Sequence, residues 1–144
     1  MDLQLISKIE KWKSIRKLLL DLLEVIPEEH LNFTVGKNMG TIGKQYRHIG
    51  DVQLCYVEAI KTGEINFSHY QKDYSLEKSK EMLHSFLVDI DRQMIEAIEK
   101  NYTAKINWFG QKLDLKEHLQ ALIEHEVLHQ GELIVYIRTL EVKF

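Results

Sequence analysis

The chain has 144 residues, of which 44% are hydrophobic and 28% charged, a composition typical of one globular domain with a buried core. Its formal net charge is -3, and its Lys and Arg residues alternate with acids instead of clustering, which argues against nucleic-acid binding. A single cysteine excludes an internal disulfide, and no segment reaches the ~20 continuous apolar residues that span a bilayer.

These features predict one domain over residues 1–144, with no membrane partner. The first thirty residues carry several charges and no uninterrupted apolar run, so we expect a cytoplasmic protein. One proline and seven glycines leave long stretches free to be helical.

The first predicted helix runs from about Leu3 to Val25 and is closed by Pro27. Apolar residues recur along it at intervals of three and four, as on the buried face of a helix. They are Leu5, Ile9, Trp12, Leu19, Leu22, Leu23 and Ile26.

A loop follows from about Pro27 to Gly40, and Thr41 is a suitable N-cap for a second helix that stops at Gly63. One stripe of this helix carries His48, which is therefore expected to face the core. The stripe comprises Gln45, His48, Val52, Cys55 and Ala59.

A second loop covers about Glu64 to Tyr74, after which Ser75 is the expected cap of a third helix. This helix supplies an apolar face and no expected metal ligand. Its face consists of Leu83, Phe86, Leu87, Ile90, Met94 and Ala97.

The next connection has a turn at Gly110 with apolar arms, which predicts a short extended flap in which Trp108 covers the core. Asp114 and Glu117 form a capping box, so a last helix should begin there and continue to about Leu140. Four long helices joined by loops predict an all-α fold, specifically a four-helix bundle, in which metal sites are built from facing helices.

His125 and His129 lie four residues apart on the last helix, so both imidazoles can reach one ion from the same face. They belong to a stripe of core spacing, and His48 is expected to look into the same core as a third ligand. Three neutral imidazoles leave a fourth coordination position open, as in catalytic zinc sites. The set predicts a divalent cofactor, zinc or nickel, and disfavours calcium and magnesium.

The remaining histidines have other expected roles. His118 precedes His125 by two turns, roughly 10 Å, so we expect it to line a cavity or make a hydrogen bond. The others are expected to be solvated bystanders: His30, His69 and His84. Cys55 is expected to be a buried small hydrophobe and no ligand.

Residues 125–129 also match the metalloprotease motif H-E-x-x-H, in which the glutamate is a general base. The extension found in many such proteases is missing, so a protease is disfavoured. Glu126 remains the candidate catalytic residue, through a hydrogen bond to a ligand imidazole or a proton transfer, with a surface or interhelical carboxylate as the alternative. Gly131 suggests close approach of a helix or ligand, or simple tolerance of glycine.

With YRHIG at residues 46–50 and HEVLHQG at residues 125–131, the chain resembles the DinB/YfiT-like family of metalloenzymes over essentially its whole length. The resemblance implies a four-helix bundle with an up-down-down-up course and a metal site at His48, His125 and His129. It also implies a homodimer, for which broad apolar content in the first and last helices gives further support.

The resemblance further implies a metal-dependent enzyme that acts on a small-molecule substrate, as a transferase of low-molecular-weight thiols or as a hydrolase. Gln130 and Glu132 depart from the residues frequent in the family, Arg and Gln, which affects substrate or helix contacts. We expect thiol transfer to an electrophile first and hydrolysis second, in an apolar pocket shaped by the loops of Met39, Tyr70 and Trp108. The alternatives are a metal-binding module for sensing or storage and an interaction module whose metal only stabilises the core.

Overall fold

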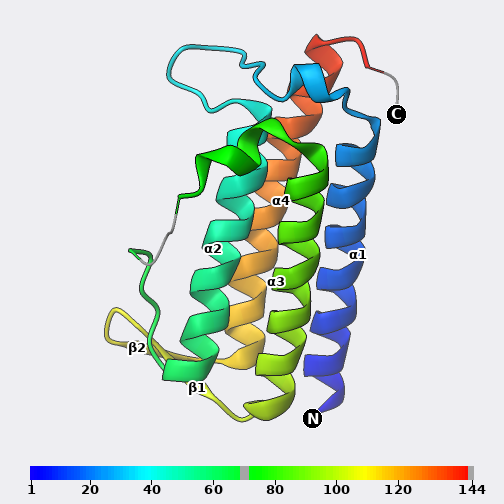
Figure 1. Cartoon of the computed structure of the whole chain (residues 1–144). Helices are drawn as coiled ribbons and strands as arrows, with labels where there is room; N and C mark the ends of the chain where they lie inside the picture. Colours follow the sequence, from blue (N-terminus) through cyan, green and yellow to red (C-terminus); the bar gives the residue numbers. More distant parts are fainter. Residues whose placement is uncertain (69–71, 143–144) are drawn as a thin grey trace.

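The computed structural model describes residues 1–68 and 72–142 and has the expected all-α architecture, a four-helix bundle (Figure 1). The helices run up-down-down-up, so α1 and α4 are parallel neighbours, as are α2 and α3. In chain order, the elements are α1 (Leu3–Val25), η1 (Glu28–His30), α2 (Ile42–Thr62), η2 (Tyr74–Lys78), α3 (Lys80–Lys100), β1 (Lys105–Trp108), β2 (Gln111–Asp114) and α4 (Leu115–Thr139).

Local capping explains where the helices begin and end. The Thr41 hydroxyl accepts a hydrogen bond from the Lys44 backbone N–H at 3.1 Å, and α2 ends at Gly63 with φ +83°. The capping box of Asp114 and Glu117 is present at the start of α4. These predicted caps are therefore confirmed.

The start of α3 differs from the prediction, because its N-cap is Ser79 and not Ser75. Ser75 lies in the 3-10 helix η2, which packs directly on α2. The contact is so close that a Cβ on Gly43 would lie 2.0 Å from the Glu77 carbonyl oxygen. The packing of η2 on Gly43 thus keeps η2 separate from α3. The sequence around Ser75 does not reveal this constraint.

The predicted flap is a β-hairpin in which β1 pairs with β2 in antiparallel register. Its two-residue turn places Phe109 at φ +52° and Gly110 at φ +97°. Trp108 donates a hydrogen bond from Nε1 to His118 Nδ1 at 3.0 Å, which ties the hairpin to α4. The hairpin covers one end of the bundle, as predicted for Trp108.

The interior consists of two apolar clusters. One surrounds Trp12, Val57 and Leu119 in the half that holds the hairpin, and the other surrounds Leu19 and Tyr136 in the opposite half. Buried polar residues lie between the two clusters along the chain on α1 and α4, namely Arg16, Glu126 and Gln130. In the described part of the chain, no helix combines the length and the apolar character required to cross a membrane.

Candidate metal centre

His48 on α2 and His125 and His129 on α4 lie together in the structure. Each offers one ring nitrogen, and these nitrogens lie within 4.8 Å of one another. The rings are half-buried, at the edge of the core and not at its centre, because the most buried face of α4 carries Glu126, Leu133 and neighbouring residues. We call these three residues the histidine cluster.

The ring geometry suits a small ion. Nε2 of His125 lies 3.1 Å from Nε2 of His129, and the His48 ring centroid is 5.3 and 4.9 Å from theirs. Two nitrogens bound tetrahedrally to zinc at its usual bond length are separated by about 3.3 Å, close to the spacing of the His125 and His129 nitrogens. With all three ligand nitrogens within 4.8 Å of one another, the cluster could hold a metal ion.

The cluster disfavours protonation of its own members. Burial lowers the pKa of His125 to about 4, and the neighbouring charges of His129 and His48 add to this effect. Burial also lowers the pKa of His48, with a further contribution from His129. Because a metal binds the neutral imidazole, these two side chains are ready for coordination near neutral pH.

His129 has partners on both helices. Its Nδ1 lies 3.0 Å from Gln45 Oε1, and Gln45 donates from Nε2 to Glu132 Oε2 at 3.1 Å. The direct separation between His129 Nδ1 and Glu132 Oε2 is 3.5 Å, too long for a good hydrogen bond. Outer partners of this kind orient the ligands of metal sites.

Glu126 points away from this arrangement. Its side chain is fully buried. Oε1 accepts a hydrogen bond from Arg16 Nε at 3.0 Å and forms an ion pair with Arg16 Nη2. Its other oxygen, Oε2, has no hydrogen-bond partner among the described residues, and the same holds for Nδ1 of His125. The structure thus places the candidate catalytic carboxylate in an interhelical ion pair.

Arg16 extends that pair into a network that joins all four helices. It also donates to Asp91 on α3 and to Gln53 on α2, and Gln53 donates to Asp91 at 3.0 Å. Burial raises the pKa of Asp91 to about 6, although Arg16 opposes the shift. We call Arg16, Gln53, Asp91 and Glu126 the Arg16 network; sequence analysis missed it, although Arg16 occupies an apolar-stripe position of α1.

The other histidines lie outside the cluster. His118 is buried and makes the expected hydrogen bonds, with Trp108 at Nδ1 and the Tyr56 carbonyl at Nε2, 3.0 Å away. His84 is exposed, as predicted, and His30 is half-buried in η1. His69 and Tyr70 lie outside the described residues.

Two further expectations can be compared with the structure. Cys55 is buried among apolar side chains and is not part of the cluster, as predicted. Gly131 has open space above it, since a Cβ there would meet no atom within 4 Å. Within the described residues, no other helix approaches Gly131 closely.

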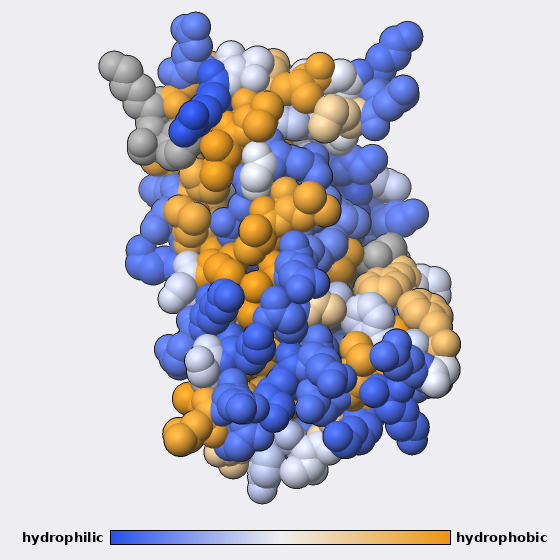
Figure 2. Space-filling view, turned by 180° about the vertical axis from the view of Figure 1, so that it is seen from behind, coloured by the Kyte–Doolittle hydropathy of each residue, from blue (hydrophilic) through white to orange (hydrophobic). Residues whose placement is uncertain are grey.

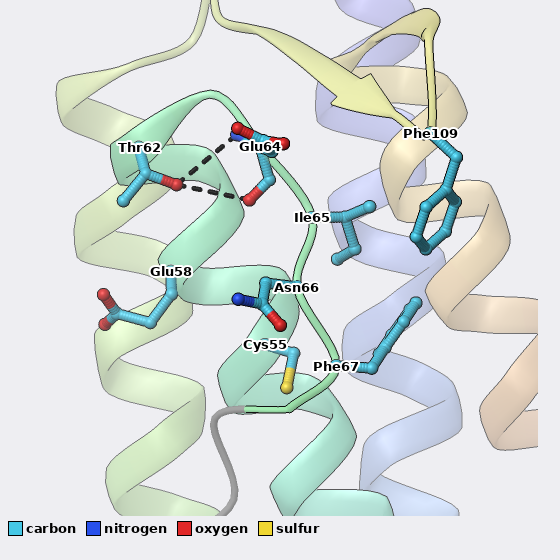
Figure 3. A pocket seen from close by; sticks show the side chains of 8 residues that line it. All are labelled: Cys55, Glu58, Thr62, Glu64, Ile65, Asn66, Phe67 and Phe109. Carbon is cyan, nitrogen blue, oxygen red and sulfur yellow. Dashed lines mark hydrogen bonds between the residues drawn. The ribbon is translucent and has the colours of Figure 1, made fainter.

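A cavity of about 740 Å³ lies further along α2, where Cys55 forms part of its wall (Figure 3). Figure 3 shows Ile65, Phe67 and Phe109 on one side of the segment after α2, and Asn66 and Glu58 on the other. The rings of Phe67 and Phe109 stack with centroids 6.4 Å apart. The described lining residues include no member of the histidine cluster.

Comparisons with known proteins agree with this fold. Among solved structures, a DinB-like protein from Bacillus subtilis superposes with a TM-score of 0.74 at 20% sequence identity, covering 96% of each chain. A DinB-like protein from Bacillus cereus gives a TM-score of 0.74 at 18% identity, covering 94% of this chain and 92% of that one. No curated protein matches. The DinB family profile matches residues 1–142, and the chain therefore belongs to the DinB family.

Proposed function

We propose that this protein is a metal-dependent enzyme in which His48, His125 and His129 hold one divalent ion, zinc or nickel. The observation that carries the proposal is the convergence of three ring nitrogens from two helices within 4.8 Å. Lone imidazoles inside a protein ordinarily hydrogen-bond to backbone or water, as His118 does here with Tyr56. The cluster instead directs imidazole nitrogens toward one another, as ligands do around an ion.

A divalent ion held by three imidazoles supplies Lewis acidity at its remaining coordination position. We propose transfer of a low-molecular-weight thiol to an electrophile as the preferred reaction. The thiol loses its proton to solvent, its sulfur forms the new bond to carbon, and the leaving group departs from that carbon with its electron pair. Hydrolysis of a small substrate, with water as the nucleophile, is the second choice.

For Glu126 we propose a positional contribution to this activity. It is bonded to Arg16 and fully buried, so it has little freedom to carry a proton to a substrate. It immediately follows His125 in sequence, and its ion pair holds α4 against α1. The interhelical bond would thereby keep His125 in its place beside His48.

The cavity along α2 is our candidate for the organic part of the substrate. Cys55, in its wall, lies two helical turns after His48, on the same face of α2 and about 10 Å along the axis. Its volume of about 740 Å³ is in the range of small-molecule sites, and Phe67 and Phe109 offer an aromatic wall. Substitution of the exposed Phe109 with Ala should raise KM for an apolar electrophile more than it lowers kcat.

We further propose a cytoplasmic homodimer that associates through α1 and α4. Figure 2 shows apolar side chains gathered on the face opposite to the view of Figure 1. On these helices, Leu18, Val127, Leu128 and Val135 are 49%, 50%, 62% and 56% exposed, and the open face of Gly131 permits close helix approach. A second copy would bury this apolar surface with its own equivalent.

Sedimentation tests the dimer directly. Wild-type protein should sediment as a dimer at micromolar concentration, whereas Leu128→Lys/Val135→Lys should sediment as a folded monomer. The matched control Val88→Lys changes an exposed valine of α3 and should leave the dimer intact. A monomeric wild type would refute the proposed association.

Metal content tests the site. Protein purified without added metal should contain about one divalent ion per chain by elemental analysis, and His48→Ala, His125→Ala and His129→Ala should each lose it. His84→Ala removes an exposed histidine of α3 and serves as the control that should retain it. Full metal content in His125→Ala/His129→Ala would end the proposal.

Activity separates the enzyme from its alternative, a metal-binding module without turnover. Metal-loaded wild type should consume a low-molecular-weight thiol in the presence of electrophiles, or hydrolyse small esters or amides, and metal-free protein should do neither. Added thiol should also change the visible spectrum of the cobalt-substituted protein. Absence of both turnover and spectral change across a broad panel would favour the binding module.

A further inference from the structure

Glu132 and Gln45 lie together at one edge of the histidine cluster, beside His129. Glu132 follows His129 by one turn on α4, and Gln45 precedes His48 by one turn on α2. Gln45 is 7% exposed, and its amide bonds to both His129 and Glu132. These contacts therefore connect the two helices that supply the ligands.

Glu132 determines which group donates in each of these hydrogen bonds. An ionised Glu132 can only accept, so Gln45 must turn its NH₂ group toward Oε2 of Glu132. The amide oxygen of Gln45 then faces His129, and Nδ1 of His129 must carry the hydrogen in order to donate at 3.0 Å. Consequently, Nε2 of His129 is left with a free lone pair directed at the cluster.

We infer that Gln45 and Glu132 are positioning residues that set the tautomer and ring orientation of His129. This inference rests on the proposed function, because the exposed lone pair serves to hold the metal. His125 differs, since its Nδ1 has no hydrogen-bond partner among the described residues. His129 is thus the pre-oriented ligand, and His125 adjusts to it.

The Nδ1–H tautomer is the less favoured form of a free neutral imidazole. Its presence at His129 would therefore indicate the hydrogen bond to Gln45. Nitrogen-15 NMR of histidine-labelled, metal-free protein above pH 7 should show His129 protonated at Nδ1 in the wild type. Gln45→Leu should shift His129 to the ordinary mixture dominated by Nε2–H. It should also weaken zinc binding in a chelator competition by about 10- to 100-fold, as loss of an outer hydrogen bond does at other metal sites.

A charge-swapped pair separates positioning from simple packing. In Gln45→Glu/Glu132→Gln, the new carboxylate accepts from His129 and from the new amide, so the Nδ1–H tautomer and most of the zinc affinity should return. Gln45→Glu alone places a second carboxylate next to Glu132, and the two negative charges repel each other. This single variant should therefore bind zinc more weakly than the double variant. Glu124→Gln, an exposed change beside His125, is the control that should alter neither measurement.

Two results would overturn the inference: an Nε2–H tautomer at His129 in the wild type, or a Gln45→Leu variant whose tautomer and zinc affinity match the wild type. If the wild type binds no metal, the proposed function fails. The spectrum of metal-free protein still decides the tautomer in that case. The two failures are therefore distinguishable.

Discussion

The histidine cluster and the Arg16 network are both polar groups within an apolar bundle, and α4 contributes to both. In the network, a guanidinium is bonded to two carboxylates and an amide from the other three helices. In the cluster, the ring nitrogens of His125 and His129 face one another across 3.1 Å. The ion pairs of the Arg16 network neutralise one another and stabilise the fold. The imidazoles of the histidine cluster are instead suited to bind an ion.

The difference also concerns exposure. The side chains of Arg16 and Glu126 are 3% and 0% exposed, so breaking their pair leaves a charge without solvent. His48, His125 and His129 are half-buried, so their loss leaves no buried charge. The network should therefore dominate stability, and the cluster should dominate binding.

The largest expected effect comes from Arg16→Met, which strands Glu126 and Asp91 inside the bundle. We expect a loss of about 3–5 kcal/mol in the free energy of unfolding, measured by urea denaturation. Lys17→Met, an exposed change one residue further along α1, should cost less than about 0.5 kcal/mol. Equal losses in the two variants would contradict a structural role for the network.

The next effect concerns His118, the buried histidine that is fully hydrogen-bonded. Burial lowers its pKa to about 4 from 6.5, so the folded state disfavours its protonation. Its contribution to stability is complete above pH 6.5 and is lost as the pH falls toward 4, by roughly 3 kcal/mol in total. His118→Gln should flatten the decline in unfolding free energy over this interval; an unchanged slope would argue against the assigned state of His118.

Metal should stabilise the protein through the cluster alone. Zinc at about 100 times its Kd should raise the free energy of unfolding by about 2.7 kcal/mol, as linkage requires. His129→Ala should abolish this gain while changing the stability of the metal-free protein by much less than Arg16→Met does. If zinc stabilises His129→Ala as it does the wild type, the ion binds elsewhere.

The smallest expected effect on stability comes from Gly131, a residue of α4 that belongs to neither the histidine cluster nor the Arg16 network. Gly131→Ala should raise stability by about 0.5–1 kcal/mol in the monomeric Leu128→Lys/Val135→Lys background, because alanine favours helix and meets no atom within 4 Å. Zinc affinity should not change. A loss of stability would show that Gly131 has a packing role that the chain alone does not reveal.

Sequence alone predicted the parts of the fold that depend on local chemistry. The span of α1, the caps at Thr41 and Asp114, the stop at Gly63 and the hairpin all follow from short-range preferences and were confirmed. The convergence of the three histidines was also predicted, since stripe positions on long helices are readable from spacing.

The missed features depend on contacts between distant segments. The start of α3 is set by the packing of η2 on Gly43, which lies far away in sequence. Arg16 occurs between Trp12 and Leu19 on the apolar stripe of α1, which could have signalled a buried charge, but its partners on three other helices could not be read from that stripe. The link from Glu132 through Gln45 to His129 likewise needs the relative placement of α2 and α4.

The order of the helices along the chain also determines when the cluster can form during synthesis. His48 is translated before α3 and the hairpin, and His125 and His129 follow only in α4. A ribosome-bound chain that ends before α4 has only one of the three proposed ligands, and a single imidazole binds a divalent ion weakly. Binding of the proposed ion would therefore follow translation of α4, so the ion would not guide the earlier steps of folding.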